Sequence, residues 1–362
     1  MNIAIIGGSG HYNFVFEALA LRPELRLCAV APADGDEDIS GLLAACRAHG
    51  LTPQRHDSAA ALLDAHPEIE LAAVNPWFSR AADVSIACLK RGLHVFSEKP
   101  LATRLDKLDE LENVWRESGR GLGGMFNLRY CGWFKTVQRA IAEGKIGVVR
   151  QIQGRKSYKM GNRPEFYRHR ETFGGIIPWV GIHALDWATQ IGGACVYSAA
   201  LTNADYNRGH GDMEVTSAVL MELQNGVIAT VTADFLRPDG APRHDDDRLR
   251  VTGTAGTLYA YDGQVWLEDA AGRRALPIEE SEQCLLNLID ALGTPAAIAR
   301  AQTDLAVTRT ALSSAESHTA SRVQPDSAPL GGDRSAVSSP LRALQPDSAP
   351  LGGGSSLDDC TR

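Results

Sequence analysis

A lysine with the potential for acid–base chemistry follows a short apolar segment, in the sequence Ser97-Glu98-Lys99-Pro100. The proline disfavours the helical region for the residue before it, so Lys99 is held extended. A lysine fixed at a strand end over a crevice can lose solvation, which lowers its pKa from about 10.4 toward neutrality. It can then exchange a proton with a hydroxyl or carbonyl group. Because most lysines are solvated surface groups, this interpretation needs support from other residues.

A glycine-rich turn near the start of the chain gives the first support. Residues 3–6 are wholly apolar, as expected for a buried parallel strand, and Gly7, Gly8 and Gly10 follow them, before an amphipathic stretch over 14–21. Strand, glycine turn and helix form the context of a dinucleotide-binding fingerprint, in which the backbone approaches the pyrophosphate closely. The third glycine of the consensus is absent, so the turn alone also fits a purely structural connection.

The next segments alternate between strand and helix patterns, which predicts a parallel, doubly wound sheet that binds its ligand beyond the carboxyl ends of the strands. The expected strands are 27–31, 69–74 and 93–96, with helices near 39–49 and 79–90. At one strand end, Asn75, Pro76 and Trp77 either line a nicotinamide pocket or form a capped turn with a packed ring. At another, Asp34 is the candidate to bind a ribose hydroxyl, which gives NAD a mild preference over NADP.

Taken together, these motifs resemble the Gfo/Idh/MocA oxidoreductases. The motifs that carry the resemblance are the glycine turn, Asn75-Pro76, Glu98-Lys99-Pro100, Phe126-Asn127-Leu128-Arg129-Tyr130, Gly174-Gly175 with the segment 181–186, and the segment 251–258. The resemblance implies hydride transfer between a nicotinamide and a hydroxyl-bearing carbon of a sugar, polyol or related compound. It also implies that Lys99 is the catalytic acid/base, assisted by His183, and that Gly7, Gly8, Gly10, Asp34, Asn75, Pro76, Trp77, Glu98 and Lys99 contact the cofactor.

One position departs from the family pattern. Many catalytically competent members carry Asp four residues before the histidine, where this chain has Trp179. The departure implies a different substrate, a relay through Asp186, or loss of ordinary dehydrogenase activity. His183 is expected in the first turn of a helix over 179–191, where the helix dipole favours the neutral imidazole.

Four residues are candidates for substrate contact: Arg129, Trp179, Asp186 and Tyr158. Arg129 either reaches the substrate or only supports the domain junction. Tyr158 lies in a basic, aromatic-rich segment over 156–171 that either covers the substrate or forms a solvated loop. No metal site is expected, and the acidic stretch 244–247 is interpreted as a solvated turn.

The second half of the chain has a different pattern. A long strand over 148–158 and two hairpins, turning at Asn225-Gly226 and Asp262-Gly263, predict an open, mostly antiparallel sheet with helices on one face. The expected organisation is a Rossmann domain over 1–124, an α+β substrate domain over 125–318 and a disordered tail over 319–362. The tail carries the sequence Gln-Pro-Asp-Ser-Ala-Pro-Leu-Gly-Gly twice and is too poor in large apolar residues to fold.

Composition limits the class of partner. The net charge of −8 argues against a nucleic-acid binder, and no apolar run is long enough to span a membrane. The 7 cysteines never form a Cys-x-x-Cys pair, and no secretory signal is recognised at the start, so a cytoplasmic enzyme is expected. The free face of the second sheet makes a homo-oligomer the expected assembly. Two alternatives to a dehydrogenase remain: NAD-dependent cleavage or elimination without net redox, and a non-catalytic dinucleotide sensor.

Overall fold

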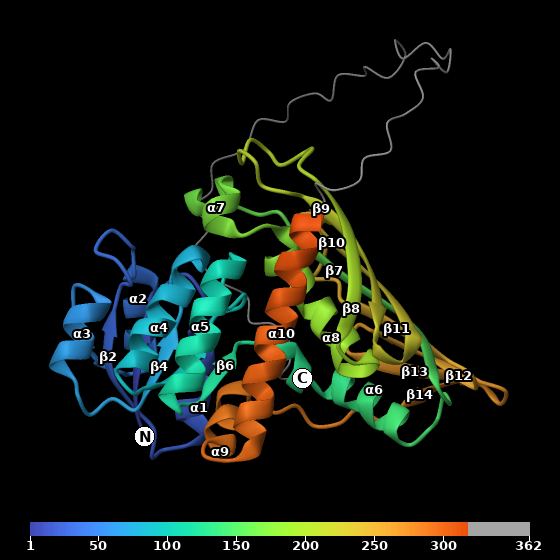
Figure 1. Cartoon of the computed structure of the whole chain (residues 1–362), viewed down its shortest axis with the longest axis horizontal. Coiled ribbons are helices and arrows are strands. Elements are labelled where there is room, and N and C mark those ends of the chain that lie inside the picture. Colours follow the sequence, from blue (N-terminus) through green and yellow to red (C-terminus); the bar gives the residue numbers. More distant parts are fainter. Residues whose placement is uncertain (318–362) are drawn as a thin grey trace, which may run out of the picture.

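The computed structural model describes residues 1–317, so the tail expected over 319–362 lies entirely outside the described residues. Two sheets and the helices that cover them make up the described part of the chain (Figure 1). No helix among residues 1–317 is both long enough and apolar enough to cross a membrane.

The first sheet has six parallel strands in the order β3-β2-β1-β4-β5-β6, so the predicted doubly wound sheet is confirmed. Its strands are β1 (Asn2–Ile6), β2 (Arg26–Ala31), β3 (Gln54–Arg55), β4 (Leu71–Val74), β5 (His94–Ser97) and β6 (Leu122–Gly124). The apolar residues 3–6 are completely buried because helices cover both faces of the sheet. The chain reverses direction across the sheet between β1 and β4, which is where ligands bind in such folds.

Helices connect these strands, as is usual for crossovers between parallel strands. They are α1 (Asn13–Leu21), α2 (Ser40–Ala48), α3 (Ala59–Ala65), α4 (Ala81–Lys90) and α5 (Leu105–Ser118), with a 3-10 turn, η1 (Phe78–Arg80), before α4. In α5 the residues that face the sheet recur at helical spacing and are buried: Leu108, Leu111 and Trp115.

The second sheet has eight strands in the order β14-β13-β12-β11-β7-β10-β9-β8. They are β7 (Val149–Lys159), β8 (Cys195–Asn203), β9 (Thr216–Leu223), β10 (Val227–Arg237), β11 (Arg248–Gly253), β12 (Gly256–Tyr261), β13 (Gln264–Asp269) and β14 (Gly272–Leu276). Every neighbouring pair is antiparallel except β10 with β7. Both predicted hairpins are confirmed, and Asn225 and Asp262 adopt the positive φ that their tight turns require.

Helices cover one face of this sheet (Figure 1). They are α6 (Gly132–Ala142), α8 (Ile182–Gly192) and α10 (Pro295–Ser317), together with the π-helix η4 (Ile177–Gly181). The helix α9 (Cys284–Ala291) packs against α1 instead, and α7 (Arg170–Phe173) and the short turns η2 (Asn127–Tyr130), η3 (Glu165–Arg168) and η5 (Gln224–Gly226) lie in the connections. The long helix α10 contacts β6 of the first sheet as well as β8 and α8 of the second domain. Because α10 returns to the first sheet, the division of the chain at residue 124 stays a prediction.

Candidate active site

The glycine turn packs tightly against two other strand ends. Gly7 has a φ of +91°, and a Cβ there would lie 2.3 Å from the backbone nitrogen of Pro76. A Cβ on Gly10 would lie 2.6 Å from Oε2 of Glu98 and 2.8 Å from Oδ1 of Asn75. The turn therefore needs glycine to bring β1, β4 and β5 together at their carboxyl ends.

Glu98 joins the turn to the strand that leads to Lys99. Its fully buried Oε2 accepts hydrogen bonds from the backbone N–H of His11 and from the ring Nδ1 of His11, both at 2.7 Å, and Oε1 accepts the backbone N–H of Lys99 at 3.0 Å. Burial alone raises the pKa of Glu98, but the His11 contacts and the charge of Lys99 outweigh it and lower the pKa. Glu98 is therefore an internal anchor, and His11 is a site residue that the sequence interpretation missed.

Asn75 presents a buried amide without hydrogen-bond partners. Both Nδ2 and Oδ1 are buried and unpaired within the described part of the chain, and Oδ1 lies beside Gly10. Unpaired buried amides are rare in proteins and call for an explanation such as a ligand or water. Pro76 is buried beside Gly7, whereas Trp77 is half-buried and stacks on Phe166 with ring centroids 6.0 Å apart.

Lys99 is held against Trp179. The lysine side chain is 1% exposed, and its Nζ lies 3.3 Å from the centroid of the Trp179 ring and donates to the Trp179 carbonyl at 3.1 Å. The indole also stacks on Phe78 with centroids 3.8 Å apart and faces His11 at 6.1 Å. Trp179 thus supplies an aromatic surface and a carbonyl oxygen to the ammonium group, at the position where the family resemblance leads us to expect a carboxylate.

His183 lies in the first turn of α8, as predicted, but the residues before it differ from the expected helix. Residues 177–181 form the π-helix η4, an irregularity that is often found at functional sites. His183 is 4% exposed, and burial lowers its pKa well below 6.5, with Lys99 and Lys156 contributing in the same direction. The neutral imidazole can accept a hydrogen bond from a hydroxyl group or donate one to it.

Glu37, rather than Asp34, is the carboxylate beside the glycine turn. Glu37 accepts hydrogen bonds from the Gly8 N–H at 3.1 Å, the Ser9 hydroxyl at 3.0 Å and the Ala33 N–H at 2.9 Å. Burial raises the pKa of Glu37 despite these hydrogen bonds. In the sequence, Glu37 differs from the expected residue, Asp34, only in lying three positions later.

The structure orients Asp34 away from this turn. Its carboxylate forms an ion pair with Arg80 at 2.7 Å, and the two side chains are each 44% exposed. This geometry favours Glu37 over Asp34 for the ribose site, because the residue that reaches the Gly8 backbone is Glu37, and the assignment of either residue stays a prediction.

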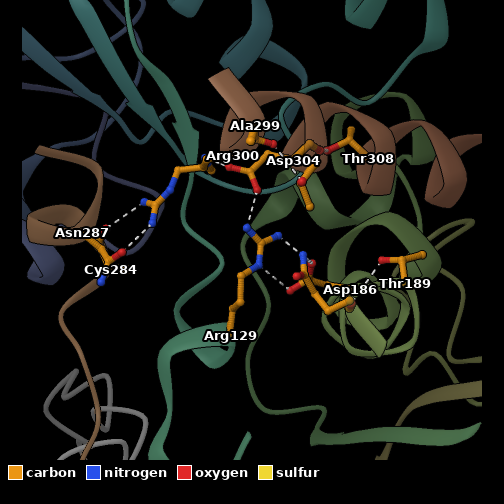
Figure 2. A network of polar contacts seen from close by, with 12 residues as sticks. Arg129, Asp186, Thr189, Cys284, Asn287, Ala299, Arg300, Asp304 and Thr308 are labelled. Carbon is orange, nitrogen blue, oxygen red and sulfur yellow. Dashed lines mark hydrogen bonds and ion pairs between the residues drawn. The ribbon is translucent and has the colours of Figure 1, made fainter. Parts of the chain in front are cut away.

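Arg129 and Asp186 contact each other rather than the centre of the site. Arg129 donates to both carboxylate oxygens of Asp186, at 2.6 and 3.0 Å, and to Asp304 of α10 at 2.8 Å (Figure 2). This geometry argues against the expected substrate role of both residues and supports the alternative of a structural junction.

Tyr158 belongs to a second charged cluster, at the end of β7. The Nζ of Lys156, which is 1% exposed, lies 4.8 Å from the Tyr158 ring and pairs with Asp247 at 2.5 Å. Asp246 is also buried and pairs with three arginines: Arg155, Arg237 and Arg248. The interpretation of 244–247 as a solvated turn is therefore wrong, because the sheet supplies positive partners that the local sequence does not reveal.

The residues at the carboxyl edge fit a nicotinamide dinucleotide. The glycine turn allows close backbone approach, Glu37 offers a carboxylate to a ribose, and Asn75 offers an unpaired amide beside Gly10. Lys99 and His183 supply two groups able to hold or transfer a proton. Tyr158 and Trp179 remain candidates for substrate contact.

Comparison with known proteins agrees with this arrangement. Residues 1–123 match the family described as "Oxidoreductase family, NAD-binding Rossmann fold", and residues 134–259 match the GFO/IDH/MocA C-terminal domain. A solved oxidoreductase structure from Thermotoga maritima superposes with a TM-score of 0.83 and 34% identity, covering 88% of this chain and 98% of that one. Levoglucosan dehydrogenase in complex with NADH shares the fold, with a TM-score of 0.72 and 17% identity over 88% of this chain and 96% of that one.

Curated relatives match over a shorter length. The 1,5-anhydro-D-fructose reductase of Ensifer adhaerens is 27% identical over 226 residues, which are 59% of this chain and 65% of the reductase. The myo-inositol 2-dehydrogenase of Thermotoga maritima is 26% identical over 201 residues, which are 54% of this chain and 57% of the dehydrogenase. Matches to both domains, together with the fold and the site, show that the chain belongs to the Gfo/Idh/MocA family of oxidoreductases.

Proposed function

We propose that the protein is an NAD-dependent dehydrogenase that acts on a hydroxyl-bearing carbon of a cyclic sugar or polyol. The observation that carries the proposal is the pair of Lys99 and His183 at the carboxyl edge of the Rossmann sheet, both almost fully buried. The similar proteins support the substrate class, because their names specify an anhydrosugar and an inositol.

The proposed chemistry assigns one role in proton transfer to each of these two residues. A bound nicotinamide supplies the hydride acceptor or donor. Lys99 receives the hydroxyl proton during oxidation and returns it during reduction. His183, which is kept neutral by burial and by two nearby lysines, hydrogen-bonds the same oxygen and orients it. Trp179 shields this exchange from water and gives the ammonium form of Lys99 an aromatic surface.

NAD is the proposed cofactor rather than NADP. Glu37 places a carboxylate between the glycine turn at Gly8 and the loop at Ala33, and an acidic residue that follows the glycine turn binds the ribose in this fold. A carboxylate accepts hydrogen bonds from the ribose hydroxyls but repels a 2′-phosphate. The positive side chain nearest to Asp34, Arg80, is already paired with it.

The first experiment combines binding with turnover. NAD, NADH, NADP and NADPH are titrated by quenching of protein fluorescence, and myo-inositol, 1,5-anhydro-D-fructose and levoglucosan are screened by absorbance of the reduced cofactor. Turnover with NAD that Lys99→Met lowers about 10²- to 10⁴-fold, with cofactor affinity retained, supports the proposal. Lys145→Met, a surface lysine paired with Glu143, is the matched control.

Other outcomes identify the alternatives. Product formation without free reduced cofactor indicates cleavage or elimination through a retained NAD. Tight cofactor binding without turnover on any hydroxylated compound indicates a sensor. Full activity of Lys99→Met contradicts the proposed mechanism.

We also propose a homo-oligomer that docks through the free face of the second sheet. Large apolar side chains are exposed there on β9 and β10: Leu220 (50%), Ile228 (42%) and Leu236 (53%). A patch of this kind commonly marks an interface. The cytoplasmic location expected from the sequence stays a prediction.

A further inference from the structure

One arginine and two carboxylates form a buried network where η2, α8 and α10 meet (Figure 2). The Arg129 side chain is 10% exposed, and those of Asp186 and Asp304 are 2% and 1% exposed. Nε and Nη2 of Arg129 donate to Asp186, and Nη1 donates to Asp304. All three guanidinium nitrogens are therefore engaged by carboxylates.

The network reaches His183 by two routes. Asp186 lies on α8, three residues after His183. Its two hydrogen bonds with Arg129 therefore fix the rotation of α8 about its axis and its position along that axis. The guanidinium also lies 5.0 Å from the centroid of the Phe126 ring, and that ring meets the His183 imidazole edge to face, at 6.4 Å between centroids. Arg129 thus supports the imidazole both through its helix and through an aromatic ring.

The same network reaches the strand that leads to Lys99. Asp304 accepts the backbone N–H of Gly124 at 2.7 Å, at the end of β6. Gly124 pairs with Ser97 in the neighbouring strand β5, two residues before Lys99. The relative position of the two proposed proton-transfer groups is therefore set by contacts that converge on Arg129.

The charges in the network make Arg129 indispensable to it. Two buried carboxylates share a single guanidinium. Burial raises the pKa of Asp304, and the charge of Asp186 adds to this shift, although Arg129 and the Gly124 N–H oppose it. The two carboxylates in turn raise the pKa of Arg129 well above its ordinary value, against the effect of burial. Removing one member of such a group leaves an uncompensated buried charge, which is strongly destabilising.

We propose that Arg129 is a positioning residue, which does not touch the substrate but fixes His183 on α8 relative to Lys99. The proposal rests on the proposed function, since it assigns a role within the same site. A neighbouring arginine offers a matched control. Arg300 is also partly buried and hydrogen-bonds Asn287 and the Cys284 carbonyl (Figure 2). It also donates to the Tyr130 hydroxyl, so it ties α10 to α9 and to η2, but among the described residues it forms no hydrogen bond with Asp186, Asp304 or His183.

The test compares Arg129→Lys, Arg129→Met and Arg300→Lys in the full chain, with myo-inositol, 1,5-anhydro-D-fructose and levoglucosan as probes. We expect both Arg129 variants to lower kcat about tenfold to hundredfold, as small misplacements of catalytic groups do, with KM and NADH affinity within about twofold of wild type. Arg300→Lys lowers Tm without changing kcat. A KM increase of about tenfold or more with kcat retained in Arg129→Lys makes Arg129 a substrate contact and overturns the proposal. A fall in Tm with both kinetic constants unchanged reduces Arg129 to a stabilising residue and also overturns it.

A second readout does not depend on turnover. The imidazole Cε1 signal of His183, assigned with His183→Gln, is followed by NMR from pH 5 to 8 in the ligand-free protein. The charges that face His183 come from two loops, from β7 and from η2, and are Lys99, His11, Lys156 and Arg129. Arg129→Met therefore shifts the signal and moves any titration of it to higher pH, whereas Arg300→Lys leaves both unchanged. An unchanged His183 signal in both Arg129 variants contradicts the proposal even if none of the probes is a substrate.

Discussion

Replacing Glu37 with glutamine removes the negative charge that contacts the glycine turn while keeping the shape of the side chain. Glutamine can still accept the Gly8 N–H through its carbonyl oxygen, but its amide nitrogen then faces the Ala33 N–H, which now lacks an acceptor. The expected result is a large gain in affinity for NADP and a small loss of affinity for NAD.

The magnitude follows from the burial of Glu37, which is 7% exposed. A carboxylate and a phosphate oxygen about 4–5 Å apart repel each other by about 2–4 kcal/mol at the effective dielectric constant of a protein surface. The ratio of NADP to NAD affinity should therefore rise roughly 30-fold to several hundredfold in Glu37→Gln. Because burial raises the pKa of Glu37, the wild-type preference for NAD should weaken as the pH is lowered.

The assay is a fluorescence titration of NADH and NADPH into wild type and three variants. Asp34→Asn tests the residue that the sequence favoured, and Asp36→Asn removes an exposed charge from the same loop as a control. Both should leave the preference within about twofold, given that exposed charges are screened by solvent. A Glu37→Gln protein that still binds NADH as selectively as wild type, or an Asp34→Asn protein that loses the selectivity, refutes the assignment.

Two more predictions concern Trp179 and His183. Trp179→Ala should lower the free energy of unfolding by about 3–5 kcal/mol in urea denaturation, because the indole is 7% exposed and stacked on Phe78, whereas Trp179→Phe should cost much less; equal losses would show that the cavity is not the cause. Folding lowers the pKa of His183, so below about pH 6.5 the unfolded chain binds a proton that the folded chain does not. The free energy of unfolding is therefore unaffected by this group above about pH 6.5. It falls by about 1.4 kcal/mol per pH unit below that pH, until the folded pKa is reached. His183→Gln should remove this slope in thermal unfolding measured from pH 5 to 7, and an identical slope in both proteins would contradict the assignment.

Local patterns in the sequence predicted the framework of the fold because they act over short distances. The apolar run over residues 3–6 indicated a strand covered on both faces, and Asn225-Gly226 and Asp262-Gly263 indicated the two tight turns. The first sheet and both hairpins follow from such signals.

The contacts that define the site depend on distant parts of the chain and could not be predicted in the same way. Asp304 meets Arg129 across 175 residues, and Glu98 meets His11 across 87. The helical pattern around Asp304 does not reveal that the Asp304 side chain pairs with a buried arginine. For Glu37, the neighbouring Asp34 matched the expected spacing better, and only the path of the loop decided between them.

The replacement of a carboxylate by Trp179 changes how Lys99 can be used. A carboxylate near the lysine would form an ion pair with it, whereas the indole attracts the ammonium through its ring and its backbone carbonyl without adding a negative charge. His183 then lacks an anionic neighbour at that position, and the charges that act on it are those of Lys99, Lys156, His11 and Arg129, all of which favour the neutral imidazole. In the proposed oxidation, the neutral amine of Lys99 accepts the hydroxyl proton and becomes an ammonium, while the neutral His183 keeps its hydrogen bond to the same oxygen. A tryptophan at position 179 is therefore compatible with dehydrogenase chemistry, in which Lys99 is the group that accepts and returns the proton.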